Sequence, residues 1–473
     1  MITVSGIGSG LDIVNLVSQL VAAEGAPKTS LYDTREAGIQ AKITAFASIK
    51  SALSTFQSSL AKLRDVANFQ GKTVTSGDSE VFFATASTVT VPGTFSVEVS
   101  ALAEAQKLIS QSYTDSDSEV GTGTLTITVG ATAVSINIDS ENNSLAGIRD
   151  AINSNFASAT VTATIINVEE GGETISKLIL TAGSTGLDNK LTVTVDDDDD
   201  DDVDSGGLSA LAYDPDAGPP VTNLTELRAA ADAAILLDGQ TVTSDNNTIS
   251  GAIEGLTITL LKASPGEPFD LTIANDEASI SSAISGFVAS YNGLISTLNS
   301  LTSYNVDTST ASVLIGDSTL RSIENQIRRI IASPIAGLGE DMNSLLSLGI
   351  TTGVDGTLVL DNDALGTALS GDVDDVAKVF TGTDGYAVRL DDLIDNLIGT
   401  GGIVNTRLDG FDLRLDDIND LREALDRRLE KIEIRLLAQF SALDAMIATL
   451  NTTSEFLTIA LASLPEPLSF LRK

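Results

Sequence analysis

Hydrophobic residues near the C-terminal end of the chain recur at alternating spacings of three and four, through residues 408–450. This 3.5-residue repeat predicts a long helix with a narrow apolar seam that a partner helix has to cover. At 1.5 Å per residue the helix would be about 64 Å long. A long helix in an ordinary bundle is the alternative interpretation, but a seam sustained over about six heptads favours a coiled coil. The seam comprises Leu408, Phe411, Leu415, Ile418, Arg422, Leu425, Leu429, Ile432, Leu436, Gln439, Leu443, Met446 and Leu450, with Phe440 beside Gln439.

The N-terminal end of the chain carries a matching pattern. Asp12 can cap a helix with an apolar stripe, and Gly25 and Pro27 are expected to end that helix. The stripe consists of Ile13, Leu16, Val17, Leu20 and Val21. A second helical segment then has a heptad seam of Ile39, Phe46, Ile49, Leu53, Phe56, Leu60 and Leu63. Because both ends of the chain need partners for their seams, we expect the terminal helices to pair with each other.

From residue 71 the hydrophobic period changes to two, which predicts β-strands. A first group, with one short helix at 144–152, has strands at 94–99, 123–129, 133–138, 161–167 and 177–181. The segments from 123 to 181 form a ββαββ unit. A second group comprises strands at 233–237, 240–243, 256–261 and 269–273, and the Asp238-Gly239 dipeptide between the first two predicts a hairpin turn. Helical patterns return from 280 and from 320, followed by a strand at 356–360 and a short helix at 373–380.

This order of elements predicts an α+β multidomain fold. Paired terminal coiled-coil helices and a helical bundle stalk would carry β-rich domains inserted at the far end. We expect four domains: the terminal coiled-coil legs (1–40 with 415–473), a helical stalk domain (41–71 with 279–414), a β-rich domain (72–118 with 226–278) and an inserted ββαββ-like tip domain with an acidic loop (119–225).

Composition removes most kinds of chemistry. The 473 residues include no Cys and no His, so thiolate or imidazole metal sites, disulfides, Cys–His nucleophiles and Ser–His–Asp triads are excluded. We therefore expect no enzyme, no catalytic residues, no metal and no cofactor. The net charge of −38 argues against nucleic acid or an anionic membrane surface as a partner. We also expect no cleaved signal peptide and no membrane span, so that any export would use another route.

Two polar features have more than one interpretation. Residues 196–202 are seven consecutive Asp, which predict a solvated loop. As a calcium loop the run fails, because Tyr213 stands where an EF-hand needs a bidentate Glu, so weak cation binding is the expectation. Arg422 and Gln439 interrupt the long seam: they either mark a bend or an exposed face, or they set register and oligomer number.

Several segments together resemble the flagellar hook-associated protein 2 family. The N-terminal signature consists of Gly8, Ser9, Gly10, Leu11, Asp12, Leu16, Val17, Leu20, Glu24, Pro27 and Leu31. Residues 93–99 with 102–106 are similar to a further family segment, and residues 123–130 with 144–153 resemble a repeat of flagellar hook and axial proteins. The C-terminal match covers residues 287–288, 291–294, 316–317, 348–350, 439–440, 443–444, 446, 450 and 456–457. The Asp run and the tail with Pro465 and Pro467 depart from the family pattern.

The resemblance implies a filament cap of the bacterial flagellum. The chain would be exported unfolded through the flagellar type III apparatus, with a chaperone before secretion, and would be extracellular at the distal tip. There a homo-oligomeric ring of about four to six copies would promote folding and insertion of flagellin and prevent its loss. Some family members also adhere to host surfaces. The alternatives are a hook–filament junction protein, another flagellar axial protein or a surface adhesin.

Overall fold

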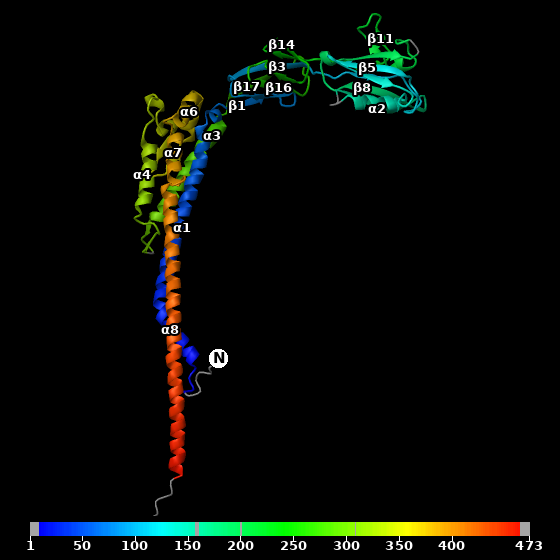
Figure 1. Cartoon of the computed structure of the whole chain (residues 1–473). Coiled ribbons are helices and arrows are strands. Elements are labelled where there is room, and N and C mark those ends of the chain that lie inside the picture. Colours follow the sequence, from blue (N-terminus) through cyan, green and yellow to red (C-terminus); the bar gives the residue numbers. More distant parts are fainter. Residues whose placement is uncertain (1–8, 157–159, 199–200, 308, 464–473) are drawn as a thin grey trace, which may run out of the picture. The chain divides into compact units, whose positions relative to one another are not determined.

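The computed structural model describes residues 9–156, 160–198, 201–307 and 309–463, so Gly8 of the signature and the tail prolines lie outside the described residues. The chain divides into two compact units. One unit combines the two ends of the sequence, Met1–Val66 and Ser279–Lys473, and the other is formed by Ala67–Ala278. Helices dominate the first unit and strands the second (Figure 1).

Two long helices run through the helical unit, α1 (Ile13–Arg64) and α8 (Ile403–Ala462). Figure 1 shows them side by side. The other helices are α3 (Glu277–Thr302), α4 (Ser318–Ala332), α5 (Asn362–Gly371), α6 (Val373–Thr381) and α7 (Tyr386–Ile398). Short hairpins are formed by β18 (Tyr304–Asn305) with β19 (Thr310–Ala311), and by β20 (Ile350–Thr352) with β21 (Leu358–Leu360).

Aromatic rings fill the core of the helical unit where α1, α3, α6 and α8 meet. The rings of Phe46 and Phe411 are 5.5 Å apart between centroids, and Phe56 lies 5.7 Å from Phe287 and 5.8 Å from Tyr291. All of these side chains are buried. The heptad seam of α1 therefore continues into a bundle core, because the same helix changes partner along its length.

The prediction that Gly25 and Pro27 end the first helix was wrong. α1 continues through both residues without interruption. A proline inside a helix removes one hydrogen bond, but the seam on both sides of it holds the segment against α8. Gly25 lies against Leu429 of α8, where an added Cβ would come within 2.7 Å of Leu429 Cδ1. The glycine therefore permits a close approach between two helices, and it does not mark a helix end.

One core of the β-rich unit is enclosed by two sheets with the orders β1-β17-β3-β13-β14 and β15-β16-β2. Alternate residues such as Val97, Ile235 and Leu271 point into this core and are fully buried, as the period of two predicts. The predicted hairpin turn is confirmed, because Asp238 and Gly239 have φ of 49° and 80° between β13 and β14. The strands are β1 (Lys72–Ser76), β2 (Phe82–Ala86), β3 (Gly93–Ala101), β13 (Ala233–Leu237), β14 (Gln240–Ser244), β15 (Thr248–Ser250), β16 (Leu256–Leu260) and β17 (Phe269–Asn275).

A second core lies between the sheets β11-β10-β9-β5-β6 and β12-β4-β8-β7, with helix α2 (Leu145–Asn155) packed on it. The predicted ββαββ order occurs, but its two strand pairs belong to different sheets, so it is not one sheet unit. Leu108 of β4 is fully buried in this core. The four-domain division stays a prediction. The strands are β4 (Lys107–Ile109), β5 (Gly123–Val129), β6 (Thr132–Ile138), β7 (Val161–Glu170), β8 (Glu173–Ala182), β9 (Leu191–Asp197), β10 (Tyr213–Asp214), β11 (Val221–Thr222) and β12 (Thr225–Arg228).

The Asp run is not wholly a solvated loop, which corrects the prediction. Its first two residues belong to β9, and Asp197 is only 7% exposed. The Asp197 carboxylate accepts a 2.9 Å hydrogen bond from the backbone N–H of Ser209, in the short 3-10 helix η4 (Leu208–Leu211). Asp202 in turn accepts a 2.8 Å bond from the Asp197 N–H. The ends of the run therefore hold a turn together by hydrogen bonds, while Asp199 and Asp200 lie outside the described residues.

Candidate assembly interface

The candidate functional site is the pair of terminal helices, which run antiparallel. Contacts between them progress in opposite directions along the two sequences. Ser9 meets Asp444, Gly25 meets Leu429, and Phe46 meets Phe411. The expectation that the two ends of the chain cover each other's seams is therefore met over this length.

The N-terminal signature fixes the start of α1. Asp12 caps the helix, because its carboxylate accepts a 3.1 Å bond from the Asn15 N–H. The backbone N–H and the hydroxyl of Ser9 both donate to the Asp444 carboxylate, at 2.8 and 2.5 Å. Asp444 is only 8% exposed. The hydrophobic period could not single it out, because an acid beside an apolar seam is ordinarily solvated.

The apolar members of the signature divide into two groups. Val17 is fully buried between the helices, whereas Leu16 and Leu20 are 36% and 44% exposed. Glu24 lies 3.8 Å from Arg428 of α8, in an exposed ion pair that contributes little on its own. Pro27 lies on the exposed side of α1. The signature thus holds α1 against α8 with some residues and presents others outward.

The predicted seam is buried only over part of its length. The seam is buried in the helical bundle and in the adjoining part of the helix pair. The buried members are Phe46, Ile49, Leu53, Phe56, Leu60, Leu63, Phe411, Ile418 and Leu425. The half-buried members are Leu408 and Leu415, which alternate with the buried Phe411 and Ile418, and Ile39, Leu429, Ile432, Leu436 and Phe440. Leu443, Met446 and Leu450 are 50%, 64% and 60% exposed. The seam therefore continues beyond the part that α1 covers.

Arg422, one of the two polar interruptions of the seam, bridges the helices. Its guanidinium lies 2.5 Å from Asp33 and 2.6 Å from Glu36, both on α1. A fork of two carboxylates opposite one guanidinium fits the interpretation that Arg422 sets the register of the pair. Gln439 is exposed, which fits the alternative of an exposed face at that position.

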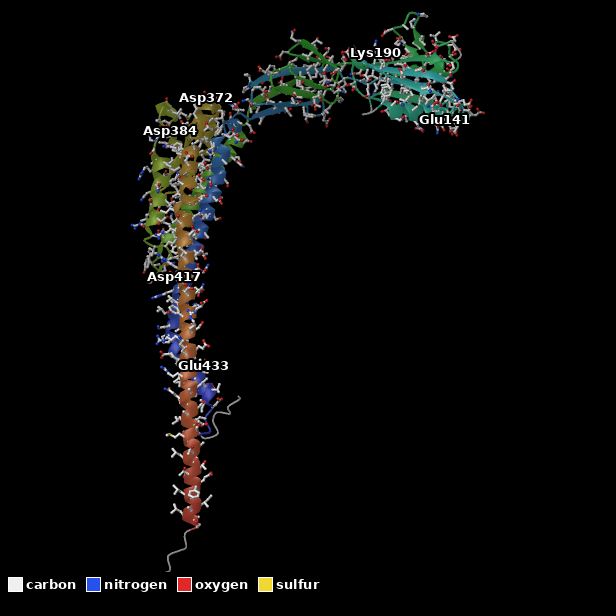
Figure 2. The ribbon with its side chains drawn as sticks, in the orientation of Figure 1. Glu141, Lys190, Asp372, Asp384, Asp417 and Glu433 are labelled. Carbon is white, nitrogen blue, oxygen red and sulfur yellow. The ribbon has the colours of Figure 1, made fainter. Side chains whose placement is uncertain are left out.

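The C-terminal part of α8 presents large apolar side chains with no protein against them. Beyond the seam residues the exposed members are Phe456, Leu457, Ile459 and Leu461. Figure 2 shows the side chains of this part projecting from a single ribbon. One helical window in the stretch Val373–Ala462 has a mean hydropathy of 1.2 and no buried part, so its length and composition alone would allow it to cross a membrane. Such a helix is weak evidence for a span, but it identifies an apolar surface that needs a partner.

Comparison with known proteins identifies the family. The family model for the flagellar hook-associated protein 2 N-terminus matches residues 9–106, and the model for its C-terminus matches residues 230–452. The chain belongs to the flagellar hook-associated protein 2 family.

Relatives within this family match nearly the whole chain. The A-type flagellar hook-associated protein 2 of Pseudomonas aeruginosa is 34% identical, over 98% of this chain and 98% of its own length. The flagellar hook-associated protein 2 of Escherichia coli K12 is 33% identical, over 96% of both chains. The family models cover the N-terminal signature from Ser9 onward and the C-terminal segments from residue 287 to 450.

A solved structure confirms the fold class. The crystal structure of the flagellar cap protein FliD D1-D2-D3 domains from Escherichia coli has a TM-score of 0.61 and 32% sequence identity with this chain. It covers 78% of this chain and 99% of its own. The α+β multidomain fold, with helical ends and an inserted β-rich region, is therefore the fold of this family.

In the described part of the chain, no group of three or more Asp and Glu side chains could hold a metal ion.

Proposed function

We propose that this chain is the filament cap of the bacterial flagellum, a structural and non-enzymatic oligomer at the distal tip of the filament. The observation that carries the proposal is the uncovered seam of α8, where Leu443, Met446 and Leu450 continue a heptad pattern that α1 does not reach. A heptad seam requires a helical partner. Membership of the flagellar hook-associated protein 2 family and the likeness to a flagellar cap protein support the same function.

The uncovered seam suggests how the cap holds the filament. Each exposed Leu or Met side chain that docks on a helix of flagellin would contribute about 1.5–3 kcal/mol of burial. The terminal legs would thus dock on the filament while the β-rich unit forms the plate. Exported flagellin would fold beneath this plate and be inserted there, so that it is not lost to the medium.

Further parts of the proposal concern partners and location. A chain without Cys forms no disulfides that would obstruct threading through a narrow channel, which supports export unfolded by the flagellar apparatus after release from a chaperone. The cap would be extracellular and would contain about four to six copies. Adhesion to host surfaces stays a prediction from the family resemblance.

Immunogold labelling of intact flagella tests the function. An antibody against this protein should place gold only at distal filament ends. Gold at the hook end would identify a hook–filament junction protein, and gold along the shaft a filament subunit. No gold on the flagella would leave the surface adhesin as the function to pursue. The same labelling on cells without the gene controls for antibody cross-reaction.

A further inference from the structure

Charge is divided between two sides of α8 in the middle of the leg. Four basic side chains in three turns of this helix line a groove of about 770 Å³ beside α1: Arg427, Arg428, Lys431 and Arg435. Helical spacing places them on one flank. Leu20 and Glu24 of α1 and Leu436 of α8 line the same groove. In a chain with 27 basic residues against 65 acidic ones, such a basic groove requires an explanation.

The other flank of the same three turns is acidic. Glu423, Asp426, Glu430 and Glu433 recur there at spacings of three and four. Glu433 lines a separate groove of about 420 Å³ with Gly25 and Leu429, on the opposite side of the helix pair from the basic groove. Figure 2 marks Glu433 on α8. Ile434, which is 61% exposed, lies one turn beyond Glu430 at the edge of this flank.

Part of each flank is paired within the chain, and part is free to pair with something outside it. Arg427 and Arg428 have ion pairs with Glu423 and Glu24, at 3.2 and 3.8 Å. Across the described ranges of the chain, Lys431 and Arg435 have no ion pair, and neither do Glu430 and Glu433. The two flanks therefore offer unpaired charges of opposite sign at the same height along the leg.

We propose that the basic groove binds the acidic flank of α8 from a second copy of this chain. The two surfaces are different, so the contact is heterologous, and because they lie at the same height a rotation about an axis along the legs repeats it without a shift. Such contacts close a ring when the rotation brings the last copy back onto the first. Ile434 of one copy then contacts the apolar side chains of Leu20 and Leu436, which line the groove of the next. This inference rests on the proposed function, since it specifies how the copies of the cap recognise one another.

The charge of the chain favours a second copy as the partner of the basic groove. A net charge of −38 on every copy opposes self-association through most of the surface. The basic groove is a place where an acidic surface of another copy is attracted instead. Complementary charges across an interface select the partner and the register more than they add affinity. The contact thus explains how strongly acidic copies assemble in one orientation.

Charge reversal tests the interface with two variants of the full chain. Lys431→Glu with Arg435→Glu makes the groove acidic, and Glu430→Lys with Glu433→Lys makes the flank basic. Each variant alone should associate at least about tenfold more weakly, measured as molar mass by light scattering at 0.15 M salt, where screening extends over about 8 Å. An equimolar mixture of the two should regain the assembly, because each acidic groove then meets a basic flank.

A control variant separates the effect of the groove from the effect of net charge. Lys50→Glu with Lys378→Glu changes the net charge by as much as the groove variant does, at exposed positions away from the groove, and should leave association unchanged. The proposal is overturned if the wild-type chain stays monomeric, if the reversed variants associate normally, or if mixing fails to restore association while both variants keep the wild-type helical spectrum. Reversed variants that form normal rings but fail to cap filaments would instead assign the groove to another partner. Immunogold labelling decides the capping function separately.

Discussion

Gly25 marks the closest approach of the two terminal helices. A leucine at this position would collide with Leu429, whose Cδ1 lies 2.7 Å from the place of a Cβ. Gly25→Leu should therefore lower the stability of the helix pair by about 1–3 kcal/mol through overpacking. The loss appears as a lower midpoint of thermal unfolding in the helical circular dichroism signal.

Two further variants separate crowding from the other effects of the substitution. Gly25→Ala should stay within about 1 kcal/mol of the wild type, because the flexible end of Leu429 can shift and alanine favours a helix by a similar amount. Adding Leu429→Ala to Gly25→Leu should restore much of the midpoint, since the smaller side chain makes room. Equal losses in all three variants would show that contact with Leu429 is not the cause.

Asp197 shows that one acidic residue of a run can be structural. Replacing it by alanine leaves the buried N–H of Ser209 without its acceptor, which should cost about 1–3 kcal/mol. Asp198 is the matched control, because it is exposed and adjacent in the sequence. Asp198→Ala should be within about 0.5 kcal/mol of the wild type. Urea unfolding of the two variants measures the difference, and a similar loss in both would mean that only net charge matters.

At the scale of elements, the sequence predicts periods better than boundaries. The strands at 123–129 and 233–237 have the predicted limits, because the alternation is unbroken in both and the Asp238-Gly239 turn ends the second. The predicted end of the first helix at Gly25 and Pro27 is wrong, because the apolar seam beyond these two residues keeps α1 helical. β4 and β12 were missed because they have three and four residues and pair with a strand far away in sequence. Such pairing depends on tertiary contacts that no local pattern contains.

The heptads of α8 have two different roles along the helix. Leu429 and Leu436 pack beside α1, so replacing both by Asp should separate the terminal helices and also prevent docking at the tip. Met446 and Leu450 are exposed, and Met446→Asp with Leu450→Asp should leave the fold unchanged. If these residues dock on the filament, the second pair should still abolish capping.

Cells that lack their own cap gene provide the measurement for the exposed pair. Complemented with Met446→Asp/Leu450→Asp, they should release flagellin into the medium and grow few filaments, while the purified variant keeps the wild-type unfolding midpoint. Thr449→Asp with Thr453→Asp is the control, since it places equal charge on exposed polar positions of the same turns. Normal filaments with the first variant would refute docking through the seam.

At the scale of the whole molecule, the sequence indicated the assembly surface but not its extent. Heptads at both ends implied that the ends pair, and the contacts from Ser9 to Phe46 agree. The point where α1 stops covering α8 could not be predicted, because the seam has the same spacing before and after it. The opposite charges on the two flanks were readable from the sequence only as a mixed-charge face. Their separation into two grooves depends on where α1 lies.

The insertion of one unit into the other leads to a final prediction. The chain enters and leaves the β-rich unit through adjacent strands: Lys72 pairs with Asn275, and the Asp276 N–H donates to Gly71 at 2.9 Å. Antiparallel partners lie about 4.5–5.5 Å apart, so a short Gly-Ser linker between Lys72 and Asn275 can replace residues 73–274. Since each unit has its own buried core, both pieces should fold separately.

Circular dichroism and calorimetry on the two pieces and the full chain test this independence. The shortened chain should be helical, the excised piece should be rich in strands, and their two transitions should reproduce those of the full chain. A piece that unfolds only when separated would show that the units stabilise each other. In cells without a cap gene the shortened chain should reach filament ends through its legs, because the uncovered seam is intact. It should still fail to retain flagellin, since the plate under which flagellin would fold is missing.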